Sequence, residues 1–482
     1  MPLHSNHTLE ESVLQEPLTT DAWNQEIVPR LPEKMEEYAW RLGAMTRKGG
    51  KIRRASDLLR GILASVLCVG SFRSLGAWGV QADVADLAHT SWRERMRKSC
   101  DWLFWLLNEL MKPERQASIP CLKKVGYEKI ELVDASQVKC LGEGGKIWRF
   151  HCMYSLCTQQ LHQVIISSTK VVESVMNFVI EKGVIYVHDS AYGYRAQIAA
   201  LCEAGAYAVT AFYPGSFPLE DAEGKEISVI AWLKRQRAKA RAIRSFSAFF
   251  RENGKRYEVR VVALRRTPEQ TKRNLGKKKK NARKDHRTLQ KETMYLAHWV
   301  LILSTLPAKD WTAQEVLSLY RARWQIEMLF KRIKQLLRQH RLRARTDETA
   351  KATVAAIIVS WVLQQEVAVQ MRSLLEEMYR EMELAQENDI DEEEEREQMV
   401  SEWRIQKVSV DLFRQQVQGP LTRQKVLACV TRLQRHLRDS PRKRVHQWQR
   451  VTQWLVDPEQ TEKSLGAGKS RKTGSALTTA LA

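Results

Sequence analysis

The stretch GVIYVHD, residues 183–189, places a short apolar run directly before a histidine and an aspartate. The stretch KIELVD, residues 129–134, has a similar design and also ends on an aspartate. Short runs rich in Ile and Val are typical of strands. Strands that are followed by a helix and another strand predict an α/β domain with a central sheet. Further strand-like runs lie at Val164–Ser168, Tyr207–Phe212 and Trp299–Ser304, and a helical pattern covers Arg195–Ala204.

The two aspartates that close these runs, Asp134 and Asp189, are candidates for a functional site. Sheets of α/β proteins carry their sites at the carboxyl ends of the strands, and both residues take that position. Aspartate is also an ordinary turn former after a strand, so each residue taken alone has a simple structural explanation.

A third candidate lies on a long helix that is predicted from Ala313 to Leu342. At about 100° per residue, four of its polar side chains fall within roughly 60° of one another: Tyr320, Arg323, Glu327 and Lys334. The rest of this helix is strongly apolar, with Trp324, Ile326, Leu329, Phe330 and Ile333. One polar stripe on a packed helix indicates a site. The alternative is a surface ion pair between Arg323 and Glu327 at positions i and i+4.

The spacing Tyr-x2-Arg-x3-Glu-x6-Lys, from Tyr320 to Lys334, resembles the signature of the DDE transposases of bacterial insertion sequences, in the large family numbered four. The short motifs Asp134-Ala-Ser and Asp189-Ser-Ala-Tyr-Gly are similar to motifs of that family as well. The resemblance covers residues 45 to 370. It implies an RNase H-like (retroviral integrase-like) catalytic core with a β-rich insertion between the second and third acids. One departure is the stretch VTAF at 209–212, where family members often have an arginine.

The resemblance implies a catalytic and metal-binding triad of Asp134, Asp189 and Glu327. Such a triad holds two Mg²⁺ ions, which take hard oxygen ligands and which Mn²⁺ can replace, about 3.5–4 Å apart. It also implies that Tyr320, Arg323 and Lys334 contact DNA. Trp299 is a DNA-binding candidate that would hold an unpaired base at a hairpin. Its alternative role is that of a core tryptophan at the start of a strand.

The expected insertion has two features of its own. Strand-like runs within Phe246–Arg266 flank Asn253-Gly254, the strongest short-range hairpin signal, because both central residues must take positive φ. The following stretch, Thr271–Arg287, is dominated by Lys and Arg. Like charges repel, so this stretch is predicted to be a loop, either neutralising phosphates or simply solvated.

The expected organisation is a catalytic core flanked by helical N- and C-terminal regions. Residues 1–125 form a helical DNA-binding region, and its basic joints also suit any solvated surface. The core occupies 126–215 and 296–375 and is interrupted by the insertion at 216–295. Residues 376–482 contain an acidic linker, a helical region and a disordered tail. The C-terminal helices Val408–Phe413 and Val426–Leu437 are candidates for a dimer contact or for closing a core.

Composition limits the function classes. The formal net charge is +22 and the sequence pI about 9.7, which predicts a polyanionic partner, first of all nucleic acid. A ribosome-bound or membrane-surface protein would also be basic. The eight cysteines lack zinc-finger spacing and are expected to be free thiols. No signal peptide or apolar run of about 18 residues is evident, so a cytoplasmic, nucleoid-associated protein is expected.

These features together predict a DNA transposase that performs cut-and-paste transposition through a DNA hairpin intermediate. Its partners would be the terminal inverted repeats of its element and target DNA, bound by a homodimer. The first alternative is a catalytically inactive, transposase-derived DNA-binding protein. A different RNase H-like nuclease, such as a resolvase or repair enzyme, and a basic structural or RNA-binding protein are further alternatives.

Overall fold

The computed structural model describes residues 21–47, 50–112, 124, 126–140, 147–336, 341–342, 344, 346–385 and 402–419. The contacts divide the chain into two compact units. One, the helical unit, comprises the described residues within Met1–Leu110, Leu336–Arg338 and Ala344–Ser440. The other, the sheet unit, comprises those within Met111–Gln335 and Gln339–Arg343.

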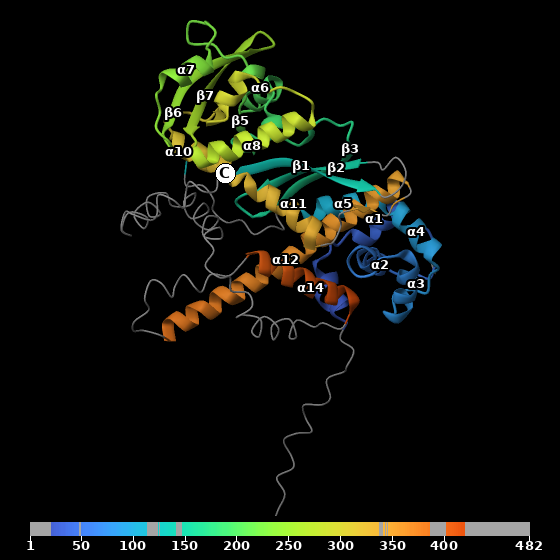
Figure 1. Cartoon of the computed structure of the whole chain (residues 1–482). Coiled ribbons are helices and arrows are strands. Elements are labelled where there is room, and N and C mark those ends of the chain that lie inside the picture. The colour runs from blue at the N-terminus through green and yellow to red at the C-terminus, as the bar shows by residue number, and fades with distance from the viewer. Residues whose placement is uncertain are drawn as a thin grey trace, which may run out of the picture. The chain divides into compact units, whose positions relative to one another are not determined.

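The sheet unit is built on one mixed sheet, which Figure 1 shows in teal, green and yellow. The strand order is β3-β2-β1-β4-β5-β8-β7-β6, and β9 pairs with β1. Strands β1, β4 and β5 run parallel, and β2, β3, β8, β7 and β6 each pair antiparallel with their neighbours. The strands are β1 Ile130–Cys140, β2 Ile147–Ser155, β3 Gln160–Ser168, β4 Ile185–His188, β5 Tyr207–Ala211, β6 Ile243–Glu252, β7 Lys255–Arg265, β8 Trp299–Ser304 and β9 Arg341–Leu342.

The predicted α/β class is confirmed, and burial explains why the central strands could be predicted from the sequence. All residues of β4 and β8 are buried, as expected for strands covered on both faces, which read as continuous apolar runs. Helix α6, Arg195–Glu203, connects β4 to β5. The prediction missed β2, whose sequence IWRFHCMYS carries Arg149 and His151 among its apolar residues. In the fold His151 is fully buried and bonded to Ser167, so tertiary contacts override its polarity.

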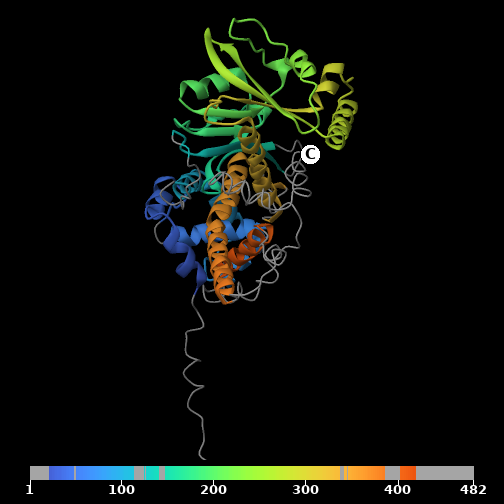
Figure 2. The ribbon, with the colours of Figure 1, turned by 90° about the vertical axis from the view of Figure 1, so that its left-hand side faces the viewer.

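The predicted hairpin is present as β6 and β7, the pair of long yellow-green strands at the top of Figure 2. Asn253 and Gly254 both take positive φ, +49° and +77°, as the turn requires. The hairpin continues the core sheet, because β7 pairs with β8. Helix α7, Val229–Arg235, precedes the hairpin, and α9, Lys291–Leu296, precedes β8.

The prediction of a basic loop after the hairpin was wrong. Most of that stretch belongs to helix α8, Pro268–Lys284. Thr267 and Gln270 form a capping box at its start, and Pro268 occupies the first helical turn, where a missing N–H costs nothing. Thr271 and Ala282 are buried. The capping box and the buried face therefore stabilise α8, although its many Lys and Arg side chains repel one another.

The predicted helix from Ala313 to Leu342 is present as two helices, α10 Ala313–Ala322 and α11 Trp324–Leu336. The interruption is at Arg323, where Ile326 N–H donates to the Arg323 carbonyl three residues back (3.1 Å). Arg323 keeps right-handed helical dihedrals (φ −50°, ψ −31°), so the polar stripe stays on one side. The predicted C-terminal end is wrong, because Leu342 lies in β9.

The helical unit contains helices from both ends of the described chain. In both Figure 1 and Figure 2, α14 lies beside α12, in agreement with their many mutual contacts. Buried Gln364 and Gln365 of α12 accept or donate hydrogen bonds with Gln406 and Ser409 of α14. The elements are η1 Trp23–Ile27, η2 Val28–Arg30, α1 Met35–Arg41, α2 Ala55–Leu67, α3 Phe72–Gln81, α4 His89–Lys98, α5 Cys100–Leu110, α12 Asp347–Ala385 and α14 Glu402–Gln418.

Within α12, Asp347–Leu374 is long and apolar enough to cross a bilayer, but 78 % of its apolar window is buried inside the protein. It therefore has the character of a core helix, packed against α5, α2, α4 and α14. The expected C-terminal helix Val408–Phe413 lies inside α14. Val426–Leu437 and most of the acidic stretch lie outside the described residues. Within the described residues the cysteines are free thiols, as predicted.

Candidate active site

The two aspartates of the predicted site lie side by side. Strands β1 and β4 are parallel neighbours, and Val133 pairs with His188, so Asp134 and Asp189 occupy the next positions on the two strands. Asp189 follows β4 directly, as predicted. Asp134 does not end its strand, however, because β1 continues to Cys140 and pairs with β2 along that length.

Backbone hydrogen bonds fix the orientation of both carboxylates. The Ala135 N–H donates to Asp134 Oδ1 (2.8 Å), and the Ala191 N–H donates to Asp189 Oδ1 (2.8 Å). Thr210, in the stretch that departs from the family pattern, donates its hydroxyl to the Asp189 carbonyl (2.9 Å). Each of these bonds to a carboxylate engages only its Oδ1 atom.

Arg323 connects the third acid to the first. Its Nη2 lies 2.5 Å from Glu327 Oε1, and its Nη1 lies 3.6 Å from Asp134 Oδ2. The ion pair that the sequence offered as an alternative therefore exists. It is not a simple surface pair, because the Arg323 side chain is only 16 % exposed and also faces Asp134. Glu327 is 42 % exposed and is the most accessible of these groups.

Burial raises the pKa of Asp134 to about 7. The Ala135 N–H and the Arg323 guanidinium lower this pKa, and the neighbouring Asp189 carboxylate raises it. A carboxyl group with such a pKa exchanges its proton near neutral pH, and a cation beside it favours the ionised form. Perturbed carboxyl groups of this kind cluster at functional sites.

The three acids suit a hard divalent cation in chemical type, since all offer carboxylate oxygens. Among the described residues, however, no group of three His, Cys, Asp or Glu side chains has the spacing of a metal site. Arg323 supplies the positive charge between Asp134 and Glu327 instead. The three carboxylates are suitable ligands for such a cation in chemical type. Glu327 would have to break its ion pair with Arg323 before it could join the two aspartates in binding one.

A cavity of about 370 Å³, here called the triad cavity, is connected to this site through Arg323, which lines it; the three acids themselves are not among its lining residues. Tyr320, Arg323 and Trp299 line it, as the predicted DNA contacts would require. The Trp299 side chain is 4 % exposed and packs under the Arg265 guanidinium (5.0 Å), so most of its ring serves the core. Lys334 lies further along α11 and does not line the cavity.

The sequence analysis missed Trp324 as a functional candidate. It was counted among the apolar residues that pack α11, yet it is 45 % exposed and lines the triad cavity. Its position next to Arg323 in the signature was the available signal. Helical periodicity was a second signal, because at about 100° per residue Trp324 lies about 60° from Glu327 and about 160° from the buried Ile326.

Comparisons with known proteins agree with this geometry. Residues 129–363 match the family described as Transposase DDE domain. The chain is 29 % identical over 342 residues to the transposase for insertion sequence element IS421 of Escherichia coli, covering 70 % of this chain and 91 % of that protein. It is also 29 % identical over 341 residues to the InsL protein of insertion sequence element IS186A of Escherichia coli K12, covering 70 % and 90 %. Residues 129–363 are thus similar to a transposase DDE domain, in a chain that is similar to transposases of insertion sequence elements.

Proposed function

We propose that this protein is a cut-and-paste transposase of an insertion sequence, with Asp134, Asp189 and Glu327 as its catalytic, metal-binding triad. The observation that carries the proposal is the convergence of the three acids: two lie on adjacent parallel strands, and Arg323 links the third to the first. The match of residues 129–363 to the transposase DDE domain supports the same assignment.

The sheet supports the RNase H-like core that the resemblance implies. Strands β3, β2, β1, β4 and β5 are consecutive in the sheet, with β1, β4 and β5 parallel. The remaining strands of the path belong to β8 and to the hairpin of the proposed insertion. In this assignment the acids come from β1, from the end of β4 and from α11.

Asp134, Asp189 and Glu327 would hold two Mg²⁺ ions, which would supply activation of the attacking oxygen and stabilisation of the leaving one. The side chains of the protein act by position and charge. Once separated from Glu327, the Arg323 guanidinium would suit bidentate contact with a DNA phosphate. Tyr320 and Lys334 are proposed as further phosphate contacts, Tyr320 inside the triad cavity and Lys334 beyond it.

A hairpin intermediate requires one base to leave the stack and be held elsewhere. The triad cavity contains two indoles, of which Trp299 is largely covered and Trp324 offers an exposed face. We assign Trp324 to contact with the displaced base and Trp299 to the floor beneath it. The proposed sequence of reactions is a nick, hairpin formation, hairpin opening and strand transfer. A homodimer would bring the two ends of the element together in the cytoplasm.

The test is cleavage of DNA that carries the ends of the element, in Mg²⁺ or Mn²⁺, by the native protein and by Glu327→Gln. We expect cutting by the native protein only and DNA binding by both, because the change removes a metal ligand and no phosphate contact. Glu292→Gln is the matched control, since Glu292 is exposed on α9 outside the triad, and it should cut like the native protein.

Two results would reject parts of the proposal. Equal cutting by Glu327→Gln and the native protein removes Glu327 from the triad. Binding of the ends without cutting by the native protein, in either metal, favours the inactive, transposase-derived DNA-binding protein.

A further inference from the structure

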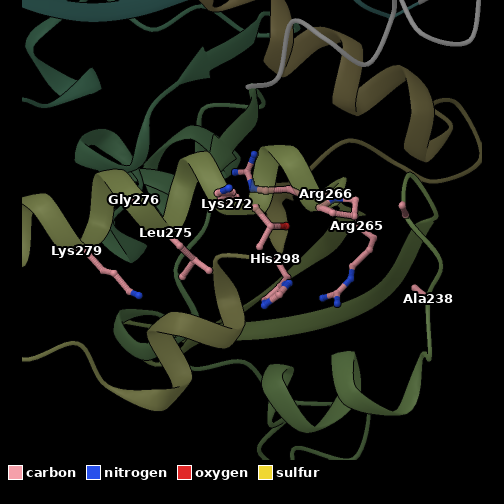
Figure 3. Close-up of a pocket in the computed structure, with 11 residues that line it drawn as sticks. Ala238, Arg265, Arg266, Lys272, Leu275, Gly276, Lys279 and His298 are labelled. Carbon is pink, nitrogen blue, oxygen red and sulfur yellow. The ribbon is translucent and has the colours of Figure 1, made fainter.

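A second cavity, of about 710 Å³, lies within the sheet unit, and the three acids are not among its lining residues either. It is bounded by one face of α8, by the end of β7 and by the loop that precedes β6. In Figure 3, the side chains of Leu275 and Lys279 point from α8 towards the side on which Arg265 and His298 lie. We name it the α8 cavity.

The lining of the α8 cavity is basic. It contains Arg265, Arg266, Lys272, Lys279 and His298, and none of its lining residues is acidic. Within the described part of the chain, Lys272 and Lys279 have no ion-pair partner, and Arg265 Nη1 is buried without a hydrogen-bond acceptor. A buried donor without an acceptor is costly, so this arrangement favours an anionic ligand.

The α8 cavity adjoins the triad cavity. Arg266 lines both of them, and α8 itself contributes Asn274 and Lys278 to the triad cavity. Lys272 and Lys279 are seven positions apart, or about 10 Å along the helix axis at 1.5 Å per residue. The basic wall is therefore long enough to accompany an extended chain of phosphates out of the triad cavity.

We propose that the α8 cavity binds the backbone phosphates of the DNA strand that passes through the triad cavity. This inference rests on the proposed function, because it takes DNA to be the occupant of the triad cavity. Lys272, Lys279 and Arg265 neutralise successive phosphates, and Gly276 leaves room for the sugar–phosphate backbone against α8. No atom lies within 4 Å of a Cβ placed on Gly276, so the wall is open there.

The first test is the salt dependence of DNA binding by Lys272→Ala/Lys279→Ala in the full chain, with duplex DNA carrying the element ends. Each phosphate contact adds about 0.9 to the magnitude of the negative slope of log affinity against log salt concentration. Loss of two contacts should therefore reduce the magnitude of the slope by about 2. The matched control is Lys277→Ala/Lys284→Ala, which removes the same charge from the opposite side of α8, since both lysines are exposed and lie at least about 120° around the helix from Lys272 and Lys279. Its slope should change by less than about 0.5. Equal losses for the two variants would overturn the proposal, since α8 would then act only through its overall charge.

The second test introduces a negative charge into the open space. Gly276→Glu should weaken binding to the same DNA at least tenfold, whereas Gly276→Ala, which fits without a clash, should bind like the native protein. Both should melt at or above the native temperature, because glycine is a poor helix former. Native affinity of a folded Gly276→Glu would overturn the proposal.

Two further readouts separate this inference from its alternatives. At saturating DNA, Lys272→Ala/Lys279→Ala should still cut in Mg²⁺, whereas Glu327→Gln should keep the native salt slope without cutting. A reduced salt slope of Lys272→Ala/Lys279→Ala, combined with retained cutting, supports phosphate binding by the α8 cavity. An unchanged salt slope rejects phosphate binding there, whether or not the variant cuts. Inorganic phosphate or a deoxynucleoside triphosphate could compete with DNA at concentrations too low to act by general salt screening. That result would assign the α8 cavity to a free phosphate ligand and overturn the DNA assignment.

Discussion

At the scale of single residues, Arg323 determines the present state of the candidate site. Its guanidinium contacts the carboxylates of Glu327 and Asp134, and it is largely buried beside them. Acidic groups that share a site repel one another, and a fixed cation offsets that repulsion. Arg323 therefore stabilises the close placement of Glu327 and Asp134, and under the proposed function it would change partners when a metal ion binds.

Arg323→Ala should lower the free energy of unfolding by about 1–3 kcal/mol in EDTA, since the charged hydrogen bond to Glu327 and the ion pair with Asp134 are lost. The deficit should become smaller in Mn²⁺, because bound cations offset the same repulsion. Urea denaturation with and without Mn²⁺ measures both values. Arg323→Lys, which keeps the charge, is the control and should lose less. A deficit that does not respond to Mn²⁺ would contradict metal binding among these acids.

The buried imidazole of His151 predicts a pH dependence of stability. Burial lowers its pKa from 6.5 to about 4, and its Nε2 lies 3.0 Å from Ser167 Oγ. As the pH falls below 6.5, His151 becomes protonated in the unfolded chain, whereas in the folded chain it stays neutral down to about pH 4. Stability is therefore lost as the pH falls through this window, by about 2 kcal/mol between pH 6.5 and 5 from this group.

The measurement is the free energy of unfolding of the native protein and of His151→Gln at pH 7, 6 and 5. The variant should show a shallower pH dependence, with the remaining loss shared by groups such as the buried His188, whose pKa burial also lowers. Parallel curves for the two proteins would show that the pKa of His151 is the same in the folded and unfolded chains.

At the scale of elements, close helix packing depends on glycine. Gly61 of α2 and Gly79 of α3 both face Trp92 of α4, whose side chain is 1 % exposed. A Cβ on Gly61 would overlap the Trp92 ring, and a Cβ on Gly79 would lie 2.6 Å from the Ala85 carbonyl oxygen. These glycines let the three helices enclose one indole, at the cost of helix propensity.

Gly61→Ala should therefore destabilise the protein by about 1–3 kcal/mol, because a buried ring must move. An alanine in an unobstructed helix has the opposite effect and stabilises by up to about 1 kcal/mol, which makes Gly276→Ala in α8 the matched comparison. Denaturation followed by tryptophan fluorescence gives the sign of each change. A stabilising Gly61→Ala would mean that α2 and α4 do not pack as described.

At the scale of the whole molecule, the net charge of +22 is the property that no single element explains. Part of it is gathered along α8, whose wall faces one cavity and whose Lys278 faces another. Basic surfaces bind nucleic acid by releasing condensed counterions. The charge thus belongs to the proposed function more than to the stability of the fold.

DNA affinity of the full chain should fall at least 100-fold between about 50 and 200 mM salt, the range over which a protein with four or more phosphate contacts loses that much. Fluorescence anisotropy with labelled duplex at several salt concentrations measures the slope. A slope of magnitude below about 1 would show that the excess charge does not serve DNA binding.

The sequence by itself determined the features that repeat at a fixed period or depend on neighbouring residues. Apolar runs identified β4 and β8, positive-φ residues identified the hairpin at Asn253-Gly254, and the helical offsets placed Arg323 and Glu327 on one side. Local backbone preferences encode these features, so they can be read without a fold. The resemblance to DDE transposases rested on the same offsets and is supported by the match of residues 129–363.

Only the tertiary structure decided the features that depend on distant partners. Pairing with β2 carries β1 past Asp134, capping and packing hold the basic stretch as α8, and Trp324 lines the triad cavity together with residues of β5, α8 and β8. The α8 cavity likewise combines residues from β7, α8 and the approach to β8. Sequence periodicity describes one element at a time, whereas burial and charge partners are set by whichever elements the fold brings together.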